Sequence, residues 1–214
     1  MTINRPGRPG DLPSAQVLWA RWALVAVLEA TAEKERRAHH RTGTWVDGTG
    51  LHLDDSGCTW WSLTPRGEGR WVLFGEDESS GCRWHEPPVD LLAGAPAWLP
   101  HQELADLLEG SELGCVYWFE DGAWARAPYP DTLDDDGLDC GMSRFADRAD
   151  VLRTIADDEH GATSAADAET LLAHAENHRL TPELLMSLTR DPHWRRRDRP
   201  AMTRALEQAG LDRR

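Results

Sequence analysis

The chain has 214 residues, a hydrophobic fraction of 40% and a mean hydropathy of −0.57, values of a folded globular protein rather than a disordered or membrane-spanning one. Its net charge of −14 is uneven: residues 41–140 carry 5 basic and 20 acidic side chains, whereas residues 1–40 and 141–214 carry +2 and −1. Because this acidic segment would repel nucleic acid and anionic lipid, we expect neither as a partner, and expect a basic partner protein instead.

The four cysteines are widely spaced, at Cys58, Cys82, Cys115 and Cys140, and no two form a C-x-x-C pair. This usage predicts reduced thiols and a cytoplasmic location. The apolar run at residues 22–28 is too short to span a bilayer, and charges nearby make it a poor signal peptide.

The sequence predicts three segments: a flexible tail over residues 1–10, an acidic α+β body over 11–142, and a helical C-terminal region over 143–214 that packs on the body as one unit. Asp11 or Ser14 can cap a long first helix running to about His39. The middle of this helix is apolar almost all round, so we expect it to be buried.

From residue 44 the pattern changes to short apolar runs separated by turn residues. This pattern is typical of an antiparallel meander. A short helix over 101–108 follows an irregular Pro- and Ala-containing link. The expected strands cover residues 44–46, 50–53, 59–64, 70–74 and 82–84.

Residues 113–130 carry the strongest local signal, two apolar runs on either side of Asp121-Gly122. This dipeptide favours a two-residue type I′ turn, and the turn sets the register of the hairpin. Both faces of the hairpin are apolar. It is therefore expected either inside a sheet covered on both sides or with one face forming an aromatic binding surface. The predicted pairs are Glu120 with Ala123, Phe119 with Trp124, Trp118 with Ala125, and Tyr117 with Arg126.

From Ser143 onward the chain is predicted to be helical: a helix over about 143–159, a second over 165–178, a third that opens at residues 181–183, and a last one over 200–210, with a turn opening at Asp191. Ser164 and Asp167 resemble a capping box. The predicted fold class is α+β: a Trp-rich antiparallel sheet, made of a meander plus a hairpin, with a long N-terminal helix and a C-terminal helical bundle.

Residues 177–192 read NHRLTPELLMSLTRDP and resemble one unit of the leucine-rich-variant helical repeat, with the pattern N-x-x-L-x-P-E-L-L-x-x-L-x-x-D-P. The following His193-Trp194 departs from the Val-Arg turn of that pattern. A single unit cannot bury its face by stacking on copies of itself. The resemblance therefore implies a helical packing element and no activity.

Three sets of residues are candidates for metal ligands. His174 and His178 have the i, i+4 spacing of zinc ligands, but their order is H-A-E-N-H rather than H-E-x-x-H. Cys82 and His85 make only half of a zinc knuckle, and the acidic loop over residues 134–139 fails the calcium-loop pattern at both ends. We predict no resident metal and no cofactor, and the histidine pair and the acidic loop stay open as metal binders.

Linear motifs of nucleophilic or nucleotide-dependent catalysis are missing, which favours a non-enzymatic function without excluding an enzyme. We expect a protein-binding module, of an inhibitor or immunity type, that engages a basic partner through an acidic Trp-rich face. The alternative is an enzyme or small-ligand protein whose pocket, between the sheet and the C-terminal helices, is lined by acidic side chains with Trp124, Arg126 and His85. The residues predicted for the binding face are Trp118, Glu120, Asp121, Trp124, Arg126 and Trp60.

Overall fold

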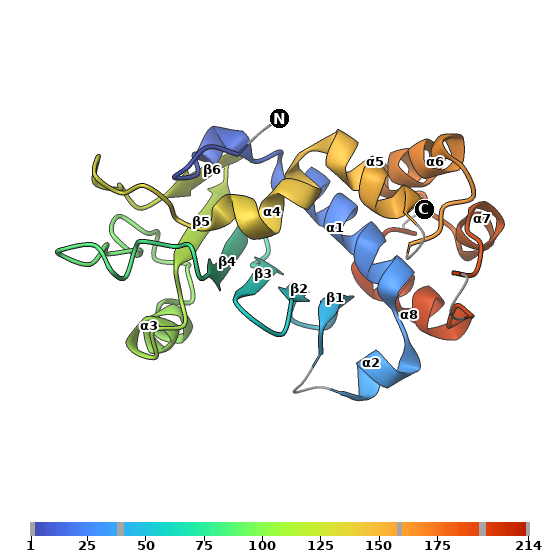
Figure 1. Cartoon of the computed structure of the whole chain (residues 1–214), viewed down its shortest axis with the longest axis horizontal. Helices are drawn as coiled ribbons and strands as arrows, with labels where there is room; N and C mark the ends of the chain where they lie inside the picture. Colours follow the sequence, from blue (N-terminus) through green and yellow to red (C-terminus); the bar gives the residue numbers. More distant parts are fainter. Residues whose placement is uncertain (1–2, 38–40, 158–159, 193–195, 213–214) are drawn as a thin grey trace.

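A computed structural model describes residues 3–37, 41–157, 160–192 and 196–212. One antiparallel sheet lies between a layer of helices and a layer of loops with one helix (Figure 1). Its strands follow one another in chain order, which confirms the predicted α+β meander with a hairpin at its end. The strands are β1 (Gly43–Val46), β2 (Leu51–Asp54), β3 (Thr59–Pro65), β4 (Trp71–Asp77), β5 (Cys115–Glu120) and β6 (Ala123–Arg126).

The β5–β6 hairpin has the predicted register, with Tyr117 opposite Arg126 and Phe119 opposite Trp124. Asp121 and Gly122 both take positive φ, at 53° and 82°, as the type I′ turn requires. Apolar clusters cover the sheet at both faces of β5, so the first of the two expectations for this hairpin is confirmed.

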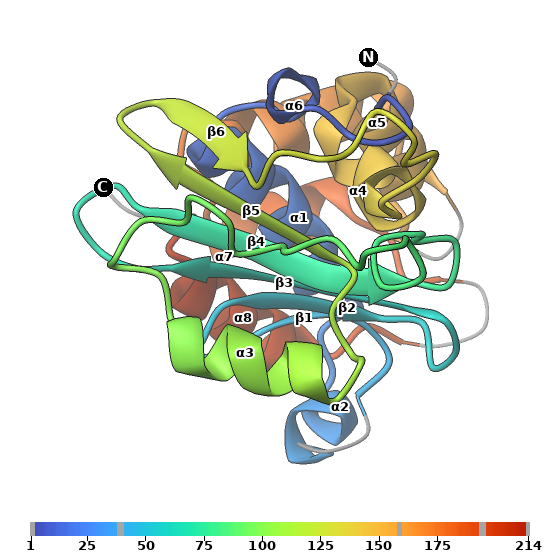
Figure 2. The same ribbon diagram turned by 90° about the vertical axis from the view of Figure 1, so that its left-hand side faces the viewer.

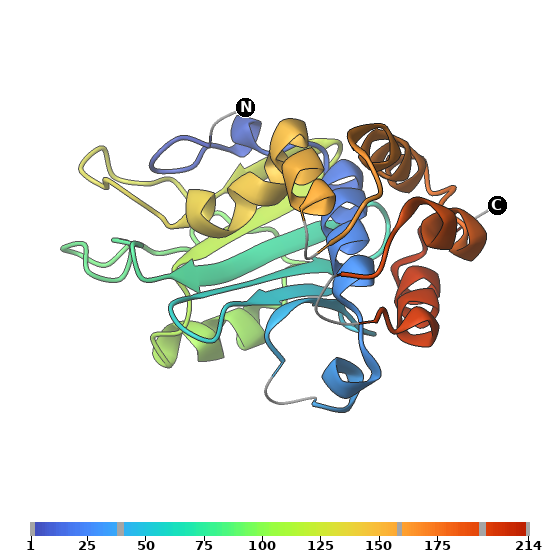
Figure 3. The same cartoon turned by 45° about the vertical axis from the view of Figure 1, so that its right-hand side comes forward.

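Helix α1 (Ala15–Glu29) runs between the sheet and the C-terminal helices, which Figure 3 shows from the side. Ser14 caps it by accepting a hydrogen bond from the Val17 N–H at 3.4 Å. Its apolar circumference is buried, as predicted, and Trp22 stacks on Phe145 with ring centroids 4.9 Å apart. The other helices are α2 (Ala32–Arg36), α3 (His101–Glu109), α4 (Leu138–Ala146), α5 (Arg148–Ala156), α6 (Ala165–Glu176), α7 (Pro182–Leu188) and α8 (Arg199–Ala209).

Three predicted boundaries are wrong. The first helix ends at Glu29 rather than near His39, a residue outside the described part of the chain, because the backbone of Ala30 is extended, with ψ of 134°. The helix predicted over 143–159 is two helices, α4 and α5, which are separated at Asp147 because this residue is extended and caps α5. The predicted end at residue 159 lies outside the described part of the chain. Residues 82–84 form a turn instead of a strand.

The tail predicted as flexible is packed where it is described. Ile3 is 3% exposed, and Asn4 donates two hydrogen bonds to Asp11. The backbone N–H of Gly7 donates to the buried carboxylate of Asp136 at 2.9 Å. Residues 3–10 therefore lie beside strand β6, at one edge of the sheet (Figure 1).

The opposite edge, strand β1, has its backbone groups occupied by side chains. Glu29 accepts from the Thr44 N–H at 2.7 Å, and Lys34 donates to the Thr44 carbonyl at 3.0 Å. The amide of Gln208, with its nitrogen turned toward Val46, donates to that carbonyl at 3.3 Å and accepts from Gly48 at 3.0 Å. Such occupation limits pairing with another chain at this edge.

The face of the sheet that packs on α1 is called the inner face, and the opposite one the outer face. The outer face divides in two by the side chains that it presents. In Figure 2 loops cross in front of β4 and β5, and helix α3 stands in front of the side of the sheet that contains β1–β3. Over β4–β6, which we call the covered half, Val72, Val116 and Trp118 pack under α3 and residues 78–100. Over β1–β3, the open half, the outward positions are mostly polar and border a groove. The Leu and Val side chains of these same strands point to the inner face.

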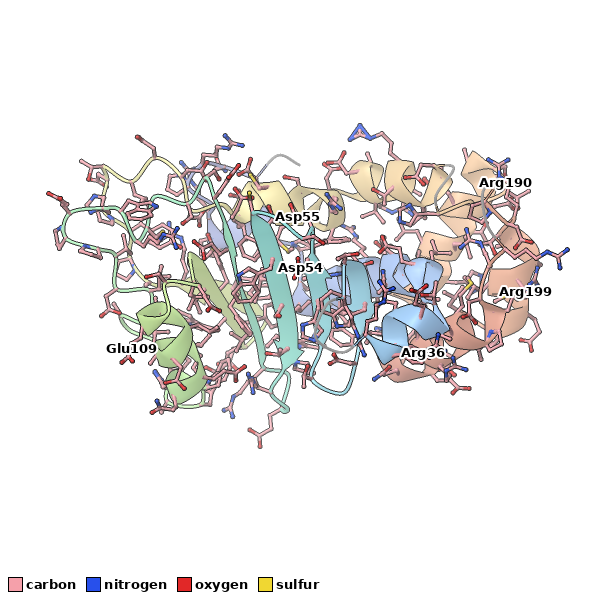
Figure 4. All side chains as sticks on the ribbon, turned by 60° about the horizontal axis from the view of Figure 1, so that its bottom comes forward. Arg36, Asp54, Asp55, Glu109, Arg190 and Arg199 are labelled. Carbon is pink, nitrogen blue, oxygen red and sulfur yellow. The ribbon has the colours of Figure 1, made fainter. Side chains whose placement is uncertain are left out.

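The charges labelled in Figure 4 are divided differently, between the part of the molecule that contains the sheet and the part that contains the helices. In Figure 4 the labelled acids Asp54, Asp55 and Glu109 lie over the half that contains the sheet and α3. The labelled arginines, Arg36 and Arg199 among them, lie over the helical half. Within the described residues, no helix combines the length and apolar character needed to cross a membrane.

Candidate functional site

Two of the three tryptophans predicted for the binding face, Trp118 and Trp124, are buried. Trp118 is 8% exposed inside the covered half, and Trp124 is 8% exposed on the inner face. The indole N–H of Trp124 donates to the Pro13 carbonyl at 2.6 Å. These rings belong to cores on opposite sides of the sheet, and the structure does not bring them to one surface.

The polar members of the predicted face are also dispersed. Glu120 accepts from Arg70 at 2.8 Å, and Asp121 is exposed at the hairpin turn. Arg126 donates to the Gly7 carbonyl at 3.0 Å, and its guanidinium carbon lies 3.6 Å from the centre of the Tyr129 ring. Of the six predicted residues, Trp60 alone lines the groove of the open half.

This groove, about 930 Å³ in volume, lies between the open half of the sheet and helix α3. Strands β2 and β3 form its floor, with Phe74 of β4 at the border with the covered half. The β1–β2 and β3–β4 turns form one end, and α3 forms the wall. Its volume is in the range of ligand-binding clefts. The lining residues are Gly48, Thr49, His52, Trp60, Ser62, Thr64, Pro65, Arg66, Phe74, Gln102, Glu103, Asp106, Leu107 and Glu112.

A row of three side chains on strand β3 dominates the floor. Trp60, Ser62 and Thr64 alternate with inner-face residues, because successive side chains of a strand point to opposite faces. The indole of Trp60 meets the ring of Phe74 edge-on, with centroids 5.9 Å apart. Thr64 is 5% exposed, and its hydroxyl has no hydrogen-bond partner.

Ser62 is held by a hydrogen-bonded chain across two strands. His52 lies opposite Ser62 in the β2–β3 register, and its Nδ1 is 2.9 Å from the serine Oγ. Its Nε2 is 3.2 Å from Oδ1 of Asp47 and 3.0 Å from the hydroxyl oxygen of Thr49. Because a carboxylate only accepts, Nε2 carries the hydrogen in the neutral imidazole, and Nδ1 accepts from the Ser62 hydroxyl.

The outer end of this chain is fixed by further contacts. Trp45 stacks on His52 with centroids 5.2 Å apart, and Arg41 approaches Asp47 to 3.5 Å. Partial burial acts to raise the pKa of Asp47, but hydrogen bonds from His52 and Thr49 outweigh it and hold this pKa well below its ordinary value. Asp47 is therefore ionised at neutral pH and keeps His52 in the tautomer that accepts from Ser62.

A carboxylate, an imidazole and a hydroxyl in series are also parts of a serine nucleophile. Acyl transfer further requires N–H donors aimed at the developing oxyanion. Ser62 lies in the middle of β3, paired with His52 on one side and Phe74 on the other, so the backbone N–H groups around it are engaged by the sheet. The geometry therefore presents the Ser62 hydroxyl as an oriented hydrogen-bonding group.

The wall of the groove is acidic. Glu103 and Asp106 lie on α3, and Glu112 follows that helix. Among the lining residues these three carboxylates face one cation, Arg66, which is 3.2 Å from Glu103. Helix α3 is placed by Leu104, which is fully buried in the covered half.

The carboxylates extend beyond the wall. Glu76 lies opposite Trp60 in the β3–β4 register, and Arg83 pairs with it at 3.0 Å. Burial raises the pKa of Glu76, Arg83 opposes this shift, and the neighbouring charges of Glu112 and Asp77 add to it. The aromatic floor of the groove therefore lies in a negative potential.

Only part of this site can be predicted from the sequence. Strands 50–53 and 59–64 and the turn between them are evident from the sequence, and Trp60 is predicted as a contact. Placing His52 beside Ser62 requires the register of β2 and β3 across the connection over residues 55–58, and this connection lacks a two-residue turn that would set the register. The acidic wall depends on where α3 docks, and that contact is distant in sequence.

The residues considered as metal ligands are engaged elsewhere. His178 lies past the end of α6 with φ of 52°, and its Nδ1 is 3.0 Å from the Gly210 carbonyl; His174 is near the Arg179 carbonyl. In the acidic loop, Asp136 is 1% exposed and accepts from the Tyr117 hydroxyl. Among the residues that the structure describes, no three His, Cys, Asp or Glu side chains are grouped as a metal site would need.

The alternative pocket between the sheet and the C-terminal helices has a counterpart with other residues. A cavity of about 440 Å³ is bordered by Trp19 and Trp71, with Gln208 and His178 from the helical side. Its lining does not include Trp124 or Arg126. The third predicted residue, His85, lies in the loop layer, where its ring nitrogens contact Pro87 and Thr132.

The groove is the site that the geometry supports best, because it joins an aromatic floor, oriented hydroxyls and an acidic wall in one accessible cleft. Comparison with protein-family models, curated proteins and solved structures finds no significant match.

Proposed function

We propose that this protein is a non-enzymatic binding module that holds a basic segment of a partner protein in the groove of the open half. The observation that carries the proposal is the combination of an acidic wall with an aromatic floor. Trp60 lines the floor, where an indole can attract a cation through its π system, and Glu103, Asp106 and Glu112 supply complementary charge. An inhibitor or immunity-type protein that neutralises a basic partner is a function of this kind.

The partner is still a basic protein, as expected from the sequence, but its binding surface is the groove rather than the β5–β6 hairpin. Trp118 and Trp124 are not part of the proposed binding surface, because each is buried in one of the two cores. Truncating either would disturb core packing rather than a contact with the partner. Trp60 stays, now with the α3 wall. Nucleic acid remains an unfavourable partner on electrostatic grounds, since the wall would repel phosphates. The described cysteines are all free thiols, which fits the cytoplasmic location that we propose.

The test uses capped hexa-lysine as the probe, with hexa-glutamate as the negative control, followed by isothermal titration calorimetry. The groove variant combines Glu103→Gln, Asp106→Asn and Glu112→Gln. We expect hexa-lysine to bind the wild type, hexa-glutamate not to bind, and the groove variant to bind hexa-lysine about tenfold more weakly. Binding should weaken further as salt rises.

A matched control separates the groove from net charge. Glu86→Gln, Glu109→Gln and Asp131→Asn remove the same three charges from exposed positions that do not line the groove. Glu109 is the closest match, because it lies on α3 itself (Figure 4). This control variant should bind hexa-lysine much as the wild type does. Equal losses in both triple variants would show that only overall charge matters and would reject the groove.

A further inference from the structure

We propose that Ser62 and Thr64 form a subsite for the guanidinium group of an arginine side chain, within the groove that holds the basic segment. This inference rests on the proposed function and adds the identity of the side chain that the floor recognises. Three observations support it: the direction of the Ser62 hydroxyl, the unpartnered hydroxyl of Thr64, and the position of Trp60 in the same row.

Ser62 is an acceptor toward the groove. Its hydroxyl hydrogen is directed to Nδ1 of His52, which Asp47 holds in the accepting tautomer. The lone pairs of the serine oxygen therefore remain available to N–H groups of a ligand. A serine without this chain could turn its hydrogen toward the groove and meet a cation less favourably.

Thr64 lacks a partner although it is 5% exposed and borders an open groove. Buried hydroxyls are normally hydrogen-bonded, so an unpartnered one calls for an explanation. Thr44 has an equally unpartnered hydroxyl, but it lies on the inner face of β1, opposite Leu53. Of these two side chains, Thr64 borders the groove. Its hydroxyl oxygen is closed off from solvent in the structure, so bonding to a ligand requires rotation of the side chain about χ1.

The spacing of the row favours guanidinium over ammonium. Residues 62 and 64 are separated by two strand steps, about 6.6 Å along β3. A guanidinium presents several N–H donors in a flat fork, so its opposite edges reach two separated acceptors, whereas an ammonium is a compact charge. Its flat face also stacks on an indole, and Trp60 is one alternate position away in the same row.

The experiment compares capped hexa-arginine with capped hexa-lysine and reports the ratio of their dissociation constants. We expect the wild type to prefer hexa-arginine by about tenfold. The variant with Ser62→Ala and Thr64→Val should lose this preference and keep its binding of hexa-lysine, which depends on the acidic wall. Thr64→Ser, which restores the hydroxyl, should retain most of the preference.

The control is Thr44→Val, which removes the equivalent unpartnered hydroxyl from the other face and should leave the ratio unchanged. Urea unfolding of each variant checks that the fold is intact. A wild type without arginine preference, or a preference that survives the double substitution, would overturn the subsite while leaving the groove as a cation site. If hexa-lysine binding does not depend on Glu103, Asp106 and Glu112, the proposed function fails, and the subsite fails with it.

Discussion

The covered and open halves of the outer face belong to one continuous sheet, yet one is packed under other parts of the chain and the other borders a groove. In the covered half the outward positions are apolar, as at Val72, Val116 and Trp118, and α3 with its preceding loops closes over them. In the open half they include His52, Ser62 and Thr64, and α3 borders a groove instead. The difference shows that side-chain composition at outward positions decides where a sheet accepts a cover and where it leaves a cleft.

Equivalent truncations in the two halves should therefore have very different costs. Trp118→Ala removes an 8% exposed ring from a packed cluster, and we expect it to lower the free energy of unfolding by about 3–5 kcal/mol. Trp60→Ala, at the half-buried margin, should cost less than about 2 kcal/mol. Urea unfolding followed by circular dichroism measures both. Similar losses at the two sites would remove the distinction between the halves.

Strand β1 of the open half is supported from the inner side by a buried carboxylate. Glu29 binds Thr44 and Lys34 with one oxygen and lies 3.0 Å from Nε2 of His160 with the other. His160 is 6% exposed and also contacts Asp157 at 2.8 Å. We expect Glu29→Gln to lower the free energy of unfolding by about 2 kcal/mol near pH 6, because a buried charged hydrogen-bond network is broken.

This loss should depend on pH in a defined way. Burial acts to lower the pKa of His160, but hydrogen bonds and charges from Glu29 and Asp157 outweigh it and raise this pKa above 6.5. The contribution of His160 to the free energy of unfolding is therefore complete below pH 6.5 and is lost as the pH rises through the folded-state pKa. Burial acts to raise the pKa of Glu29, but His160, Lys34 and Thr44 lower it from 4.5 to about 2, so its contribution is complete above pH 4.5 and lost as pH falls toward 2.

The difference between the wild type and Glu29→Gln should therefore be largest between pH 4.5 and 6.5, and urea unfolding at several pH values measures it. Glu35→Gln is the control, because its partner Arg204 lies in an exposed pair and no buried histidine is involved. A difference that stays constant from pH 3 to pH 9 would contradict the network.

The smallest effect concerns the two unpartnered hydroxyls. Thr44→Val and Thr64→Val each replace a buried hydroxyl by a methyl group of similar shape, and we expect either no change or a gain of up to about 1 kcal/mol. The two gains should be similar, because both hydroxyl oxygens are closed off from solvent and lack a hydrogen-bond partner. Differential scanning calorimetry measures them, and a loss of stability in Thr64→Val alone would show that its hydroxyl is hydrogen-bonded in the free protein.

The sequence by itself determined the local features. Asp121-Gly122 can form a type I′ turn because both residues tolerate positive φ, and the register of β5 and β6 follows from that turn. The all-round apolar pattern after Ser14 determined that α1 is buried. Alternation along β3 required Trp60 and Trp61 to point to opposite faces.

Tertiary structure alone decided which of those two tryptophans is the core residue. Trp61 is fully buried under the inner cluster and Trp60 borders the groove, and no local preference separates them. The chain from Asp47 through His52 to Ser62 depends on the register of β2 and β3, and the acidic wall depends on where α3 docks. Both are contacts between segments distant in sequence, set by packing of the whole chain rather than by the preferences of neighbouring residues.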